Sequence, residues 1–112
     1  MLHKMKLQQA PFSQISKGKK TIELRLWDEK RQKIAVGDMI LFTCNFDASR
    51  SLMCTVVALH RFSSFAQLYA TLPMEKCGYD NPKLAKPDDM LLYYSAEEQK
   101  RYGVVGIEIQ LM

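Results

Sequence analysis

The 112-residue sequence lacks any long apolar run, and it contains few cysteines, glycines and prolines. No stretch approaches the roughly 20 apolar residues that span a bilayer, and the N-terminus lacks the apolar segment of a secretory signal peptide. Three cysteines without a C-x-x-C pair exclude a fully paired disulfide scaffold and a zinc knuckle. The five glycines form no phosphate loop or dinucleotide fingerprint. We therefore expect a soluble cytoplasmic protein that takes no metal and no cofactor and does not bind a membrane.

Length and composition predict one domain over residues 1–112. The chain is 47% hydrophobic and 25% charged, which lies in the ordinary globular range. It is too short for two domains that each bury a core. Nothing in the sequence sets the oligomeric state, and a monomer is the default expectation.

Positive charge is concentrated in the first third of the chain. Residues 1–33 hold nine basic side chains against three acidic ones, whereas residues 34–112 hold seven against nine. Such an excess is typical either of a solvated basic face or of a surface that binds a polyanion, with nucleic acid as the first candidate. Lys4 and Lys6 lie on one face of an expected first strand and are candidates for contacting such a partner.

Apolar periodicity predicts about five strands and three or four short helices. The strands are expected within residues 3–7, 21–27, 39–45, 52–60 and 105–111, and the helices begin near residues 11, 63, 87 and 95. The third and fourth strands are apolar on both faces and should lie inside the sheet. We expect residues 74–86 to form a loop, and Met90, Leu91 and Tyr94 of the following helical stretch to point inward. This order favours an α+β fold, a small mixed β-barrel with short helices.

The densest polar segment runs from residue 18 to residue 25, with the sequence GKKTIELR. Glu23 and Arg25 share one face of the expected strand and lie about 7 Å apart along it, so the guanidinium can reach the carboxylate. Lys20 joins them only if the regular strand begins after it, which Gly18 allows. Two interpretations stay open: a site in which two cations and an acid converge, or an outward salt bridge worth about 0 to 1 kcal/mol.

The pattern G-x-K-x-x-E-x-R, formed by Gly18, Lys20, Glu23 and Arg25, precedes a Gly-Asp pair and an apolar strand. It resembles the ASCH domain, a relative of the PUA RNA-binding fold, and the resemblance continues to the closing strand. It implies a PUA-like barrel whose polar cleft, lined by Lys20, Glu23 and Arg25, binds RNA or a modified nucleoside. There Glu23 would accept hydrogen bonds from the exocyclic amine of a base, while Lys20 or Arg25 would meet a phosphate.

The resemblance also implies an enzymatic alternative. Some bacterial members of the family remove the acetyl group from N4-acetylcytidine with a lysine, a threonine and a downstream glutamate, and others cleave single-stranded RNA. Lys20 matches the lysine, but Glu23 stands where the threonine is expected, and Glu75 matches the glutamate only loosely. A metal-independent hydrolase with Lys20 and Glu23 as catalytic residues is therefore the alternative to a binding module. A protein-interaction domain is a second alternative.

Aromatic side chains are the other requirement for binding single strands, because each unstacked base gains roughly 1 to 3 kcal/mol on a ring. Trp27, on the strand face of Glu23 and Arg25, and Tyr79, in the expected loop, are the candidates. Tyr69 and Tyr94 fit the apolar stripes of helices and are expected to pack in the core.

Two further positions near the ends of expected elements carry polar or reactive groups. Arg61 follows the fourth strand and is a candidate nucleic-acid contact, while its neighbour His60 is expected to have a structural or rim role. Cys77 stands next to a glycine and is expected to be accessible, although no base for it is identifiable.

Overall fold

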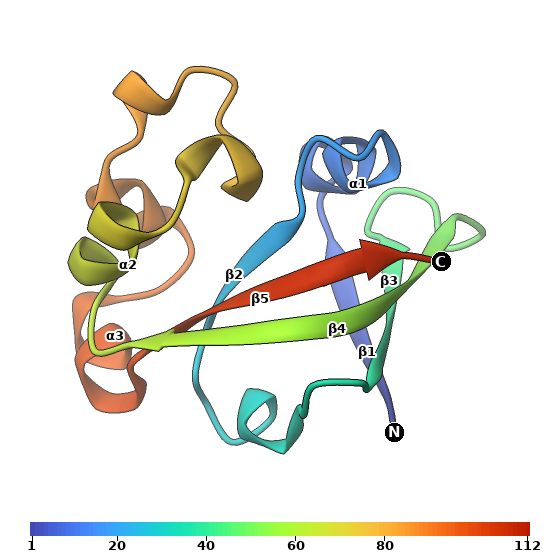
Figure 1. Ribbon diagram of the computed structural model, residues 1–112, viewed down its shortest axis with the longest axis horizontal. Coiled ribbons are helices and arrows are strands. Elements are labelled where there is room, and N and C mark those ends of the chain that lie inside the picture. The colour runs from blue at the N-terminus through green and yellow to red at the C-terminus, as the bar shows by residue number, and fades with distance from the viewer.

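Five strands form one mixed sheet in the computed structural model, which describes residues 1–112 (Figure 1). The strands are β1 (Leu2–Leu7), β2 (Ile22–Leu26), β3 (Met39–Cys44), β4 (Ser51–Phe62) and β5 (Val104–Leu111). Their order in the sheet is β1-β3-β4-β5-β2, with β1 parallel to β3 and every other neighbouring pair antiparallel. β3 and β4 thus lie inside the sheet, as their two apolar faces predict.

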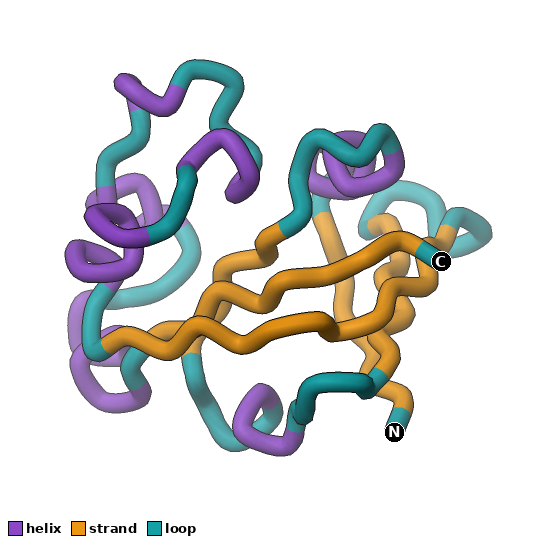
Figure 2. The backbone as a smooth tube through the Cα atoms, in the orientation of Figure 1, coloured by secondary structure: helices purple, strands orange, loops and turns teal.

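The sheet curls into a half-barrel rather than a closed barrel (Figure 2). β1 and β2 are its two edges, and no backbone pairing joins them. A side chain crosses the gap instead, because Nη2 of Arg25 on β2 donates a hydrogen bond of 2.9 Å to the backbone carbonyl of Lys6 on β1. The predicted α+β fold class with short helices is confirmed, and the barrel is open along this one seam.

Three α-helices and four 3-10 turns connect the strands. The helices are α1 (Gln9–Ser16), α2 (Phe65–Thr71) and α3 (Ala96–Tyr102), and the turns are η1 (Arg31–Lys33), η2 (Met74–Cys77), η3 (Pro82–Leu84) and η4 (Pro87–Leu92). α2 and α3 lie at the end of the sheet where β4 ends and β5 begins (Figure 1). None of these helices has the length and apolarity required to cross a membrane.

Side-chain caps explain where two of the helices begin. The Ser64 side chain accepts a hydrogen bond from the backbone N–H of Gln67 and starts α2. Ser95 and Glu98 form a reciprocal capping box at the start of α3, as the S-x-x-E spacing predicts. Of the adjacent residues predicted to point inward, Met90 is buried as predicted, but the position predicted for Leu91 is wrong, because its side chain is half-exposed in the 3-10 turn η4.

Two apolar clusters hold the molecule together. The larger cluster fills the concave side of the curl and joins β1, α1, β3, β4 and β5, with Ile40, Phe42 and Cys54 fully buried. The smaller cluster lies between β2 and the segments α2, η2 and η4, with Leu68 fully buried. β2 therefore has packed side chains on both faces. Its even-numbered residues, Ile22, Leu24 and Leu26, pack against α2, η2 and η4.

The core assignment predicts a large difference between two phenylalanines of the β3–β4 hairpin. Phe42 is fully buried, whereas Phe46 is 79% exposed. We expect Phe42→Ala to lower the free energy of unfolding by about 3 to 5 kcal/mol. The matched variant Phe46→Ala should change it by no more than about 0.5 kcal/mol. Urea denaturation of both variants tests the assignment, and equal losses would contradict it.

Candidate functional site

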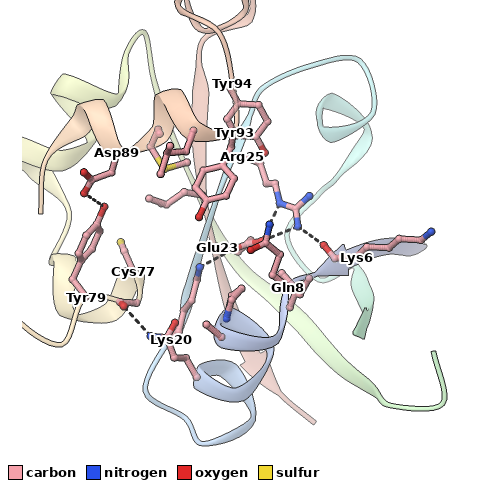
Figure 3. Close-up of a pocket in the computed structure, with 18 of the residues that line it drawn as sticks. Lys6, Gln8, Lys20, Glu23, Arg25, Cys77, Tyr79, Asp89, Tyr93 and Tyr94 are labelled. Carbon is pink, nitrogen blue, oxygen red and sulfur yellow. Dashed lines mark hydrogen bonds and ion pairs between the residues drawn. The ribbon is translucent and has the colours of Figure 1, made fainter. Parts of the chain in front are cut away.

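A cavity of about 510 Å³ opens at the seam between the two sheet edges. Its lining comes from the end of β1, from α1, from β2, and from the η2 and η4 segments (Figure 3). These elements lie far apart in the sequence and meet because the sheet curls without closing. The seam is therefore the place where polar side chains can stand inside the fold and still face solvent.

Glu23 is the centre of the cavity floor, and two cations hold it (Figure 3). The residue is 5% exposed, and it is the only charged residue of the chain that is buried. Its Oε1 lies 2.8 Å from Nζ of Lys20. Its Oε2 accepts one hydrogen bond of 2.9 Å from Nε of Arg25 and lies 2.8 Å from Nη2 of the same guanidinium. Of the two open interpretations of this segment, the convergent arrangement is the one present.

The local chain path explains how Lys20 reaches Glu23. Gly18 adopts a left-handed conformation with φ of 76° at the end of α1, which turns the chain back. The backbone N–H of Lys20 then donates to the carbonyl of Gln14, and that of Thr21 to the carbonyl of Lys76. Regular pairing of β2 begins only at Ile22. Lys20 therefore lies outside the strand, its side chain does not follow the alternation between the two faces of β2, and it reaches Glu23.

The electrostatics keep Glu23 ionised. Burial raises the pKa of its carboxyl group, but the charges and hydrogen bonds of Lys20 and Arg25 outweigh burial and lower the pKa from 4.5 to about 2. A carboxylate with such a low pKa is a weak proton acceptor. Glu23 is thus suited to be a permanent hydrogen-bond acceptor, while its single negative charge balances one of the two positive charges on the floor.

Tyrosines form the wall opposite the ion pair. Tyr69, Tyr79, Tyr93 and Tyr94 all line the cavity, and Tyr93 is 58% exposed at its mouth. The hydroxyl of Tyr79 donates to Oδ2 of Asp89 at 2.7 Å and lies 2.7 Å from the hydroxyl of Tyr69. Burial and these hydrogen bonds raise the pKa of Tyr79, so its hydroxyl remains protonated and fixed in place.

Sequence reasoning missed part of this wall. Tyr69 and Tyr94 do pack against the smaller apolar cluster, and the Tyr94 ring is stacked on Phe65, but both also face the cavity. The acid of the wall is Asp89, whereas Glu75 is exposed and outside the lining, so its placement as the downstream acid is not supported. The pair of adjacent tyrosines at positions 93 and 94 is the feature of the sequence that could have identified this part of the wall.

The remaining candidate residues lie apart from the ion pair. Lys6 lines the cavity, but its amine points away from Glu23 and only its carbonyl contacts Arg25 (Figure 3). Lys4 is exposed on β1 and outside the lining. Trp27 and Arg61 stand together at the other end of β2, with the guanidinium carbon of Arg61 4.7 Å from the centroid of the indole ring.

Cysteine and histidine side chains supply no reactive centre in the cavity. Cys77 lines it but is buried, so the expectation of an accessible thiol is wrong; burial also raises its thiol pKa to about 11. His60 lies 2.9 Å from a carboxylate oxygen of Glu108, across the β4–β5 pair and outside the cavity. No group of three or more His, Cys, Asp or Glu side chains is arranged to hold a metal ion.

A PUA-like half-barrel with a polar cleft at its seam is the class that this fold and motif define. A family model of the ASCH domain matches residues 5–112, and the chain belongs to the ASCH domain family. No curated protein matches the sequence.

Solved structures agree with this assignment. The hypothetical protein PH0355 is 33% identical over the full length of both chains, with a TM-score of 0.84. The protein PF0455 from Pyrococcus furiosus is 32% identical over 100% of this chain and 98% of its own, with a TM-score of 0.75. The ASCH protein from Zymomonas mobilis shares the fold at 13% identity, with a TM-score of 0.66 over 97% of this chain and 66% of its own.

The low pKa of Glu23 predicts a loss of stability in acid. Because the folded-state pKa of about 2 lies below the ordinary 4.5, ionised Glu23 stabilises the fold above about pH 4.5, and this contribution disappears as the pH falls towards 2. The shift corresponds to a contribution on the order of 3 kcal/mol. The difference in unfolding free energy between wild type and Glu23→Gln should therefore shrink by that amount between pH 5 and pH 2.

Urea denaturation of both proteins across this pH range measures the difference. Asp38 also has a pKa lowered to about 2, chiefly by its hydrogen bond to His3, but it is common to both proteins and cancels. A gap between the two proteins that stays constant from pH 5 to pH 2 would show that Glu23 does not titrate in this way.

Proposed function

We propose that residues 1–112 form one ASCH-type module that binds a nucleobase, either of single-stranded RNA or of a modified nucleoside, in the Lys20–Glu23–Arg25 cavity. The observation that carries the proposal is an ionised carboxylate, held between two cations, on the floor of a cavity walled by tyrosines. The cavity volume of about 510 Å³ lies within the range of small-ligand sites, about 300 to 1,000 Å³. Membership of a PUA-like family supports nucleic acid as the partner class.

The hydrogen-bonding groups of the floor suit the edge of a base. A carboxylate offers about four acceptor positions, of which Lys20 and Arg25 use three, so Glu23 retains an acceptor for an exocyclic amine. Lys20 uses one of its three donors on Glu23 and keeps the others for a ring carbonyl. A base with an amine and a carbonyl on one edge, such as cytosine, would meet both groups.

The charge balance of the cavity favours an uncharged ring over a phosphate. The amine of Lys6 points away from Glu23, and the remaining charges of the lining are the positive ones of Lys20 and Arg25 and the negative ones of Glu23 and Asp89. A phosphate in this place would have to draw the cations away from Glu23 and leave a buried charge unpaired, which is costly. The expectation that Lys20 or Arg25 contacts a phosphate is therefore replaced by a role in orienting Glu23 and the base.

The hydrolase alternative has weaker support. Glu23, at the position where the family's nucleophilic threonine is expected, is a weak base because of its low pKa. No second acid takes the place expected for Glu75, since Asp89 is already hydrogen-bonded to Tyr79 and to the backbone of Lys86. Binding without turnover is the function that these residues favour.

Tyr93 provides the test of the binding proposal that least disturbs the fold, because its side chain is exposed at the cavity mouth. Loss of one base-stacking ring costs about 1 to 3 kcal/mol, so Tyr93→Ala should weaken binding of cytidine and of oligocytidine RNA about 5- to 150-fold. Leu84→Ala, an exposed site on η3 outside the lining, is the matched control and should leave affinity unchanged. Isothermal titration calorimetry measures both.

Two outcomes decide against the proposal. Equal affinities for the Tyr93 and Leu84 variants, or no binding of any nucleoside or RNA by wild type, would remove the cavity as a base site. Deacetylation of N4-acetylcytidine or cleavage of single-stranded RNA without added metal, faster than in Lys20→Ala, would establish the hydrolase instead.

A further inference from the structure

A second hollow, of about 470 Å³, lies at the other end of β2 and shares no residue with the first cavity. β2 ends there, β4 passes into α2, and α3 passes into β5. Its lining is rich in aromatic and basic residues: Trp27, Arg61, Phe62, Ser63, Gln67, Lys100, Arg101, Tyr102 and Gly103. We call it the Trp27 hollow.

Positive charge in the Trp27 hollow is uncompensated. Arg61, Lys100 and Arg101 are exposed, the lining contains no carboxylate, and none of the three cations takes part in an ion pair. Four acids lie near it in the sequence. Asp28 pairs with Arg31, and the Glu98 carboxylate accepts from the backbone of Ser95. Glu29 and Glu97 are exposed, lie outside the lining and form no ion pair with its cations. The first cavity, by contrast, has its cations balanced.

Stacking holds the two guanidinium groups in place. The guanidinium carbon of Arg61 lies 4.7 Å from the Trp27 ring centroid, and that of Arg101 lies 5.2 Å from the Tyr102 ring centroid. When a guanidinium stacks on an aromatic ring, its N–H groups point outward in its own plane and stay available. Two of them can donate hydrogen bonds to two oxygens of one phosphate. Neither arginine has a carboxylate to compete for those donors.

Polar groups at the start of α2 complete the hollow. The side-chain oxygen of Gln67 accepts from the backbone N–H and the hydroxyl of Ser63, which leaves its amide N–H donors without an intramolecular partner. The backbone N–H of Trp27 donates to the carbonyl of Gly103 at 3.0 Å, so the ring that supports Arg61 is anchored to the start of β5. The hollow thus offers fixed donors, a positive field and aromatic surface.

We propose that the Trp27 hollow binds the phosphodiester backbone of single-stranded RNA, with Arg61, Lys100 and Arg101 contacting phosphate oxygens. The choice of RNA as partner rests on the proposed function, whereas the preference for phosphate rests on the charges of the hollow itself. Trp27 directly follows β2 and stands four residues after Glu23, about 13 Å along an extended chain. A short oligonucleotide spans such a distance.

Trp27 is the sole tryptophan of the chain and lines this hollow, so tryptophan fluorescence detects a ligand that binds there. We expect an eight-nucleotide oligocytidine RNA to change that fluorescence saturably. The double variant Arg61→Gln, Arg101→Gln should bind the RNA at least tenfold more weakly. The slope of log affinity against log salt should decrease in magnitude by about 1.4, because each phosphate contact on a single strand contributes about 0.7.

The matched control removes the same charge elsewhere. Arg50→Gln, Lys83→Gln takes away one arginine that stacks on a ring, Phe12, and one exposed lysine, both outside the two cavities. Because neither residue borders the Trp27 hollow, this variant should keep the RNA affinity within about twofold of wild type. Equal losses of affinity and slope in the two double variants would overturn the proposal. Tripolyphosphate that binds as tightly as the RNA would overturn the assignment of the partner.

Free cytidine separates this inference from the proposed function. Cytidine carries no phosphate, so calorimetry should give the same affinity for wild type and for the Arg61, Arg101 variant, with no change in Trp27 fluorescence. If cytidine does not bind but the RNA still acts through Arg61 and Arg101, the base cavity fails and the phosphate site stands. If cytidine binds and the RNA response ignores both arginines, the phosphate site fails alone.

Discussion

A buried carboxylate between two cations is the interaction on which the site depends. Glu23 would destabilise the fold if it were alone at 5% exposure, because an unpaired buried charge costs several kcal/mol. Lys20, from the turn after α1, and Arg25, from the same strand, remove that cost at one oxygen each. The three residues therefore tie the α1–β2 connection to the strand, and Arg25 extends the network to the carbonyl of Lys6 on β1.

The same network explains why the barrel stays open. If β1 and β2 paired through their backbones, the seam would close and no room would remain for polar side chains. The Arg25 guanidinium on β2 donates a hydrogen bond to the backbone carbonyl of Lys6 on the β1 edge. The two edges are therefore connected by a side chain and not by backbone pairing. The gap becomes a cavity, walled on its far side by η2 and η4. An open seam is thus a property of the side chains at positions 23 and 25 as much as of the strand order.

Local patterns in the sequence predicted the strands, a helix cap at Ser63 or Ser64 and a second cap at Ser95, since each depends on neighbouring residues. They put Glu23 and Arg25 on one face and left open whether Lys20 joins them. They missed what long-range packing decides. The 3-10 turns have no extended periodicity, so the apolar pattern did not place Asp89 and Tyr93 across the cavity from β2. The alternation of side chains along the expected strand placed Trp27 on the same face as Arg25. Because β2 ends at Leu26, the tryptophan lies in the Trp27 hollow and not in the first cavity.

The distribution of charge is likewise decided by how distant parts of the chain pack together. Counting along the chain assigns the positive surface to residues 1–33, but two of those cations, Lys20 and Arg25, are paired with Glu23 inside the fold. The exposed cations that gather around one hollow come from positions 61, 100 and 101, in the part of the chain with a net negative count. A balanced cavity selects its ligand by shape and hydrogen bonds, and it adds little salt-dependent attraction. An unbalanced hollow does the reverse, because its field attracts any phosphate chain. A single strand that occupied both would therefore obtain its affinity from one end of β2 and its specificity from the other.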